Sequence, residues 1–248
     1  MNISVIIPIV QVRYATALTI RILYNTLHPH QVILIDASEA GFTCPSQVYL
    51  GLNLKYIRVL PNQTVPYFIP GWGTNEAWAW GFKNLARETE LVSVFNDDII
   101  IGRDFFRILD NTFMKAPARY VMAVPQTVGM VEKVHEELPT KPNYIPTKKR
   151  IGYAFTIKKS FLDEMTPIPE SLKIFYGDNW IMNQVHRQGY RILLMRNNRI
   201  FHYGGSSVKQ VKEAMALHDK KSFGKGFRRK EYDQYLREVK ALKEGGKG

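Results

Sequence analysis

The feature that most constrains this chain is a repeated order of short apolar runs and helix-like segments over its first hundred residues. The apolar runs are rich in β-branched residues and end at polar or turn-forming residues, as strands buried on both faces do. Strands that alternate with helices build a mostly parallel sheet with helices on its faces, an α/β fold. We expect strands over 3–9, 32–35, 54–60 and 91–95, a helix over 15–26, and a helix that Thr74 caps and that continues through Phe82.

The second half of the chain is less regular. A proline- and lysine-rich stretch over 136–150 predicts a loop that is long for a compact domain. Beyond Gly205 the spacing of apolar residues is helical again. We expect strands over 120–124, 152–157 and 190–195, and a helix over 179–188 that Gly189 ends.

The bulk composition limits the class of protein. Of the 248 residues, 45% are hydrophobic and 23% are charged, which is typical of a folded chain rather than a disordered one. A single cysteine, Cys44, excludes an internal disulfide and every multi-cysteine metal site. No apolar run approaches the roughly 18 residues of a membrane span, and the N-terminus has no basic leader. We therefore expect no transmembrane segment and a cytoplasmic location, or the host cytoplasm for a viral protein.

The charge is unusual and uneven. Thirty-four Lys and Arg against twenty-two Asp and Glu leave +12, and residues 206–248 hold twelve basic and six acidic residues. Such a field favours polyanionic partners, although a basic tail is as often only solubilising. Phe223 and Phe227 lie among the basic residues, a mixture that can stack on bases and pair with phosphates. The candidate nucleic-acid contacts are Lys220, Lys221, Lys225, Arg228, Arg229 and Lys230.

Acidic residues follow two of the expected strands. Ligands of open α/β sheets bind beyond the carboxyl ends of the strands, so these residues are informative. Asp36 ends the second run, and Asp97 and Asp98 follow the fourth. Two adjacent carboxylates favour a nearby cation, such as a divalent ion on a diphosphate, although aspartate is also common in turns for capping reasons alone.

Two later segments carry further candidates. Asp178 opens a helix, where it serves either as a cap or as a general base. His202 precedes Gly204 and Gly205 at the start of another expected helix. Paired glycines before a helix expose backbone amides that can hold a phosphate, and the histidine is a metal ligand, a phosphate contact or a structural residue.

The order of these motifs resembles the family 2 glycosyltransferases of the GT-A fold, especially their rhamnosyltransferase-like branch. The chain departs from the family pattern at Gly177, where the family has an acid, and in the proline-rich LPNQTVPYFIP before Gly71. The resemblance covers about residues 3–208 and is carried by ISVIIP, VILIDAS, GWGTN with Gly81, VSVFNDDIIIG, the strand from Tyr153 to Ser160, GDNWIMNQVHRQGYRI and FHYGGS.

The resemblance implies a GT-A (Rossmann-like) catalytic domain over 1–205. Its nucleotide-sugar-binding half would span 1–102, its acceptor half 103–205, and a basic helical C-terminal extension 206–248. It also implies a metal-dependent, inverting transfer of a hexosyl or pentosyl group from a nucleotide-diphosphate sugar to an acceptor hydroxyl. The expected cofactor is Mn²⁺ or Mg²⁺.

Roles for individual residues also follow from the resemblance. Asp178 takes the place of the catalytic base. Asp98 and His202 take the place of metal ligands, and His202, Gly204 and Gly205 would hold the phosphates. The implied contacts of the donor nucleotide are Pro8, Asp36, Ser38, Asn75, Asn96 and Asp97.

The acceptor is the most open question. The basic extension favours a nucleic acid, such as a hydroxylated base in modified DNA that is flipped out or single-stranded. The alternative is an anionic cell-surface glycan or lipid-linked sugar, with peripheral membrane contact through the extension. A non-catalytic nucleic-acid-binding protein explains the charge but gives Asp98, Asp178 and His202 no shared purpose. A dinucleotide-binding oxidoreductase is set aside, because Glu76 stands where the fingerprint that begins at Gly71 needs its third glycine.

Overall fold

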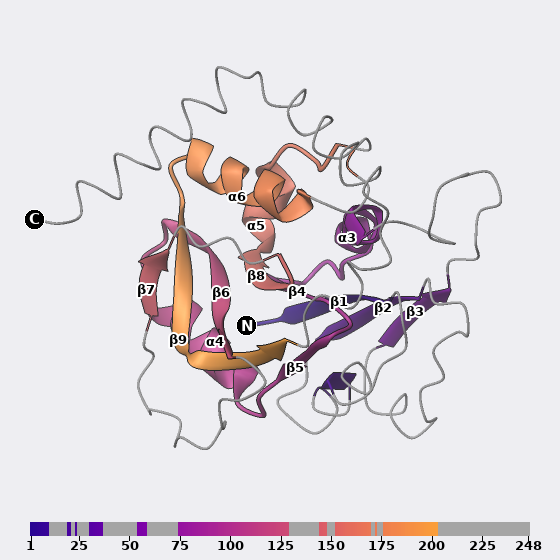
Figure 1. Cartoon of the computed structure of the whole chain (residues 1–248). Coiled ribbons are helices and arrows are strands. Elements are labelled where there is room, and N and C mark those ends of the chain that lie inside the picture. The colour runs from indigo at the N-terminus through magenta and orange to yellow at the C-terminus, as the bar shows by residue number, and fades with distance from the viewer. Residues whose placement is uncertain are drawn as a thin grey trace, which may run out of the picture.

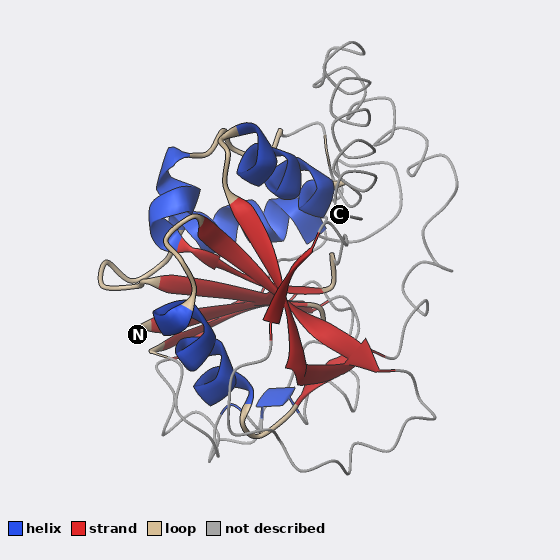
Figure 2. Cartoon of the chain, turned by 90° about the vertical axis from the view of Figure 1, so that its left-hand side faces the viewer, coloured by secondary structure: helices blue, strands red, loops and turns tan. Residues whose placement is uncertain are grey.

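A central sheet between two layers of helices organises the computed structural model of the chain (Figures 1 and 2). The structure describes residues 1–9, 19–20, 23, 30–36, 54–58, 74–128, 144–147, 152–169, 172 and 176–202. The strands are β1 (Ile3–Ile9), β2 (Gln31–Asp36), β3 (Leu54–Arg58), β4 (Leu91–Phe95), β5 (Ile99–Ile101), β6 (Tyr120–Val128), β7 (Tyr144–Thr147), β8 (Ala154–Lys158) and β9 (Arg191–His202). The helices are α3 (Thr74–Lys83), α4 (Phe105–Lys115), α5 (Lys159–Glu164) and α6 (Gly177–Arg187).

The sheet has the strand order β3-β2-β1-β4-β8-β6-β9-β5, and β7 pairs with β9. The first four strands are parallel to one another, as the alternation of strands and helices predicts. The later part is mixed: β8 is antiparallel to both of its neighbours, while β6 and β9 are parallel. A strand parallel to β4 would need a crossover that returns the chain to the edge where β4 begins. β8 instead begins at the edge where β4 ends, and it therefore runs antiparallel to β4. The α/β sheet flanked by helices is thus confirmed; its first four strands are all parallel, and its later part combines the parallel pair β6 and β9 with antiparallel pairs.

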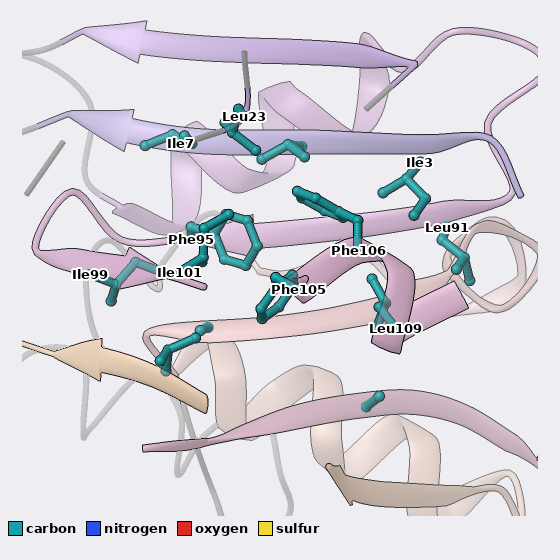
Figure 3. Close-up of a cluster of buried hydrophobic side chains, with 14 of the residues drawn as sticks. Ile3, Ile7, Leu23, Leu91, Phe95, Ile99, Ile101, Phe105, Phe106 and Leu109 are labelled. Atoms are coloured by element: carbon teal, nitrogen blue, oxygen red, sulfur yellow. The ribbon is translucent and has the colours of Figure 1, made fainter. Parts of the chain in front are cut away.

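Both faces of the sheet are buried, each against its own helices. Ile3, Val5, Ile7 and Ile9 of β1 pack in one cluster with α4, and the intervening Ile6 packs in the other cluster with α3 and α6. This is the period of two expected of a strand with two buried faces. Figure 3 shows the α4 side, where Phe95, Phe105 and Phe106 lie close together.

Most expected elements are present, with instructive differences. Residues 144–147, expected to be loop, form the short strand β7. Among the strands that the structure describes, β7 pairs with β9 only, and such an edge position tolerates Pro146, a residue without an N–H. The last expected strand is longer than its apolar run and continues to His202. Residues 19, 20 and 23 of the helix expected over 15–26 are helical, and the rest of that segment and everything beyond His202 lie outside the described residues. Besides β7, the elements β5, α4 and α5 were not expected.

The strand ends at which ligands of α/β folds bind lie together at one edge of the sheet. Because β1, β2 and β4 are parallel, their carboxyl ends meet there, and β8 starts there with Ala154 opposite Phe95. The end of β9 joins them through β5, with His202 opposite Ile99. None of the helices that the structure describes is long and apolar enough to cross a membrane.

Candidate functional site

A carboxylate and an imidazole meet where β4 gives way to β5. The turn Asp97-Asp98 follows β4, and the antiparallel pairing of β5 with β9 brings His202 beside it. His202 Nε2 lies 3.3 Å from Asp98 Oδ1. Asp97 and Asp98 are only 5% and 3% exposed. Two adjacent buried carboxylates are costly without positive charge nearby, so this turn is suited to a cation.

A divalent ion fits the residues present. Two ligands that share one ion at about 2.1 Å each lie roughly 3 Å apart, close to the 3.3 Å between His202 Nε2 and Asp98 Oδ1. Among the described residues no group of three His, Cys, Asp or Glu side chains gathers around a common point. Mg²⁺-type sites commonly use one or two carboxylates and take their remaining oxygens from substrate phosphates and water. The pair therefore fits an ion that is bound together with a diphosphate.

Tyr153 ties this pair to the rest of the site. Its ring stacks on the His202 ring, with the centroids 3.9 Å apart and the planes 15° from parallel. Its carbonyl accepts a hydrogen bond of 2.9 Å from the Asn96 N–H, and its hydroxyl is hydrogen-bonded to the Thr127 hydroxyl. These contacts fix the plane of the imidazole and hence the direction of Nε2.

Asp178 lies beside Gly152, the residue before Tyr153. It is in the first turn of α6, where the helix dipole favours a carboxylate. A Cβ on Gly152 would come within 2.7 Å of Asp178 Oδ2, so the carboxylate lies directly against the backbone beside Tyr153. Asn179 Nδ2 donates to Asp178 Oδ1 at 3.3 Å. Asp178 is half-buried, which leaves the carboxylate partly accessible.

The amino ends of α3 and α6 also meet here. Asn75, in the first turn of α3, is 1% exposed, and Gly177 is the first residue of α6. A Cβ on Gly177 would be 2.0 Å from Asn75 Oδ1, so the amide fills the space above this glycine. The structure thereby brings Asn75, Asn96, Asp98, Asp178 and His202 together through Gly152, Tyr153 and Gly177.

Two predicted nucleotide contacts lie farther along the same edge. Asp36 ends β2, is fully buried and accepts a hydrogen bond of 2.6 Å from the Tyr56 hydroxyl. It is two strands from β4, and strand spacing puts that at about 10 Å. Pro8 is inside β1, opposite Ile35. Ser38, Gly204, Gly205 and the six basic residues between Lys220 and Lys230 lie outside the described residues.

Residue-by-residue reasoning on the sequence overlooked three contributors. Gly152 and Tyr153 directly precede β8 and Thr127 lies in β6, and only the pairing of these strands with β4 and β9 reveals their place in the site. The one local signal was that Gly152 and Tyr153 begin the strand predicted over 152–157, within the segment from Tyr153 to Ser160 that the family resemblance includes.

Two groups with shifted pKa values lie at the opposite end of the same strands. Burial lowers the pKa of Lys158, which is opposite Leu91 at the start of β4. A hydrogen bond from its own backbone N–H, followed by the bond to His30, lowers the pKa of Glu88. Both groups are structural and remote from the Asp98 turn.

Comparison with known proteins identifies the fold. No family model matches the chain, and no curated protein sequence does. The solved structure of GalNAc-T7 with UDP, GalNAc and Mn²⁺ aligns over 81% of this chain with a TM-score of 0.61 and 17% identity. The structure of Staphylococcus aureus TarS 1–349 with UDP-GlcNAc aligns over 88% with a TM-score of 0.58 and 14% identity.

The chain spans only part of these proteins. It corresponds to 43% of the GalNAc-T7 chain and to 64% of the TarS 1–349 chain. Both neighbours are GT-A glycosyltransferases, and the shared elements are the central sheet and the helices on its faces. The chain therefore has the GT-A fold.

Proposed function

We propose that this protein is a metal-dependent, inverting glycosyltransferase that uses a nucleotide-diphosphate sugar as its donor. The observation that carries the proposal is the Asp98–His202 pair, which Tyr153 and Gly152 connect to Asp178 at the ligand edge of a GT-A fold. The order of the sequence motifs adds that the chain is of the family 2 type, in the rhamnosyltransferase-like branch. Proteins of the same fold were solved with UDP, with UDP-GlcNAc and, in one case, with Mn²⁺.

The donor would lie along the edge from β2 to β5. Asp36, at one end, can accept a hydrogen bond from the nucleoside, while Asn96 and Asp97 are nearer the ribose and the sugar. Asp98 and His202 would hold a divalent ion, which when bound neutralises the charge that develops on the leaving diphosphate. The roughly 10 Å from Asp36 to the end of β4 gives room for a nucleoside between the two ends.

Asp178 would act as the general base. The acceptor hydroxyl oxygen forms a bond to the anomeric carbon while the bond from that carbon to the diphosphate oxygen breaks. The hydroxyl proton passes to the Asp178 carboxylate, and the nucleoside diphosphate leaves with the electron pair. Displacement from the face opposite the leaving group inverts the anomeric configuration.

The acceptor proposal rests on the sequence. A hydroxylated base in modified DNA suits the basic extension over 206–248, and an anionic glycan or lipid-linked sugar at a membrane surface is the second candidate. The division into a catalytic domain over 1–205 and this extension is part of the same proposal. Removal of 206–248 would then lower transfer to a polyanionic acceptor and leave donor binding unchanged.

Calorimetric titration tests the donor proposal. Nucleoside diphosphates and their hexosyl and pentosyl derivatives, uridine compounds first, are titrated in Mn²⁺ and again with a chelator. We expect one nucleotide to bind only with metal, and that binding to weaken in Asp98→Asn. No binding of any nucleotide in either condition would contradict the proposal and leave the non-catalytic nucleic-acid-binding protein as the better hypothesis.

A further inference from the structure

We propose that Asn75 is a positioning residue for Asp178, and that residue 177 is glycine because the Asn75 amide occupies the space of its side chain. This inference rests on the proposed function, because it takes Asp178 as the base. It gives Asn75 a task different from the donor contact that the family resemblance implies. A donor contact would affect the Kd for the nucleotide, whereas a positioning residue would affect the rate of the reaction.

The first observation is the closeness of Asn75 to Gly177. A Cβ built on Gly177 would lie 2.0 Å from Asn75 Oδ1, 2.6 Å from Cγ and 3.1 Å from Nδ2. Packed protein interiors do not accommodate contacts of this kind without displacement of the neighbouring group. Asn75 is 1% exposed, so its amide has little free space into which it can retreat.

The second observation is how the chain enters α6. Tyr176, just before Gly177, has φ +64°, the left-handed region that non-glycine residues rarely adopt. Such a conformation persists only where the surrounding structure holds it in place. The contact between Asn75 and Gly177 supplies a restraint one residue further along. The path of the chain into Asp178 is therefore set on the amino-terminal side.

The third observation is the close approach of the Asp178 carboxylate to Gly152. A Cβ on Gly152 would lie 2.7 Å from Asp178 Oδ2 and 2.8 Å from its Cγ. The carboxylate thus rests on the Gly152 backbone, while the residue before it rests on Asn75. The contacts with Gly152 and Asn75 together fix the orientation of the Asp178 carboxylate relative to the edge of the sheet where the donor would bind. Such a fixed orientation is the preorganisation that catalysis requires.

A double-mutant cycle tests the inference. The variants are Gly177→Ala, Asn75→Ala and the two combined. Gly102→Ala is the matched control, because its Cβ would meet nothing closer than the Arg199 carbonyl oxygen at 4.0 Å. For each variant we measure the melting temperature, the Kd for the nucleotide that the titration selects, and the rate of nucleoside diphosphate release from its sugar derivative with water as the acceptor.

The sign of the stability change is itself informative. Alanine normally stabilises a helix relative to glycine, so without the contact Gly177→Ala would raise the melting temperature. We expect a decrease of roughly 3 to 10 °C from overpacking. We also expect the release rate to fall roughly tenfold to a hundredfold, because small displacements of a catalytic group have effects of this size. The Kd should stay unchanged, and Gly102→Ala should resemble the wild type.

The combined variant should recover part of both losses, since Asn75→Ala removes the atoms that alanine at 177 would meet. Asn75→Ala alone should lower the release rate and leave the Kd unchanged. The positioning role is overturned if the two substitutions are additive, if the release rate does not follow the recovery of stability, or if Asn75→Ala acts only on the Kd. A wild-type protein that binds no nucleotide would instead overturn the proposed function, while the stability cycle would still report the steric contact.

Discussion

The two sides of the site are built in different ways. The metal side, defined as Asp97, Asp98 and His202, comes from the ends of strands and is placed by the pairing of β5 with β9. The base side, defined as Asp178 with Gly152, Asn75 and Gly177, comes from the start of a helix and is placed by close packing on two glycines.

The difference between the two sides concerns charge as well as construction. Asp97 and Asp98 are buried carboxylates that favour a cation, whereas Asp178 is half-buried and is stabilised by its own helix. Binding of the donor should therefore depend on the metal side, and turnover should depend mainly on the base side. The predictions below test whether these two dependences can be separated.

The largest effect is expected for Asp178→Asn. The amide keeps the shape of the side chain but cannot accept the proton of the acceptor, so turnover should fall roughly 10²- to 10⁴-fold. The Kd for the nucleotide should not change, because the metal side is intact. Asp163→Asn, at an exposed carboxylate of α5 that pairs with Lys159, is the matched control. Wild-type turnover in Asp178→Asn would remove this residue from the mechanism.

Asp98→Asn should have the next largest effect, on the affinity for the nucleotide rather than on turnover. Loss of a charged ligand should weaken nucleotide binding in Mn²⁺ by at least about tenfold and abolish the difference between Mn²⁺ and chelator. Calorimetry measures both, and Asp104→Asn, at an exposed carboxylate paired with Arg107, is the control. Equal weakening with and without metal would mean that Asp98 acts on the fold rather than on an ion.

Tyr153 tests whether the two sides are connected. Tyr153→Leu removes the ring that stacks on His202, and we expect metal-dependent nucleotide binding to weaken about tenfold. Tyr153→Phe keeps the stacked ring and loses only the hydroxyl, so its affinity should fall by only about twofold to fivefold. Equal losses in the two variants would show that the hydroxyl, and not the stack, is what matters.

The smallest effect is expected for Thr127→Val. This substitution removes the hydroxyl that is hydrogen-bonded to Tyr153, at a cost of about twofold to fivefold in the same affinity. The loss should match that of Tyr153→Phe, and the combination should be no worse than either variant alone, since both remove one bond. Additive losses would place Thr127 in a separate interaction.

The sequence was most informative where the pattern of neighbouring residues along the chain determines the structure. The β-branched runs of β1, β2 and β4 are buried on both faces, and their ends predicted Asp36 and Asp98 as edge residues. Helix α4 was also within reach, because Phe105, Leu109 and Phe113 repeat at helical spacing. Short β5, with three residues after the Asp97-Asp98 turn, has too little pattern to be recognised.

What could not be predicted depends on contacts between distant segments. The stacking of Tyr153 on His202 follows from the register of β4 with β8 and of β5 with β9, and neither register is encoded by a local pattern. Gly177 looked like a missing acid until the position of Asn75 was known. A glycine that makes room for a partner cannot be distinguished by sequence alone from one that merely ends a turn.

The irregular pairing of β9 with β6 has a consequence for how the histidine is aimed. Met195 lies opposite Pro125 and Arg199 opposite Gln126, so residues 196–198 face a single step of β6, and β9 bends in Figure 1 before it reaches β5. The extra residues let β9 pair with β6 along its first part and then bend toward β5, where His202 lies opposite Ile99. The place of the imidazole beside the Asp98 turn is therefore set by this bulge as well as by the β5 pairing.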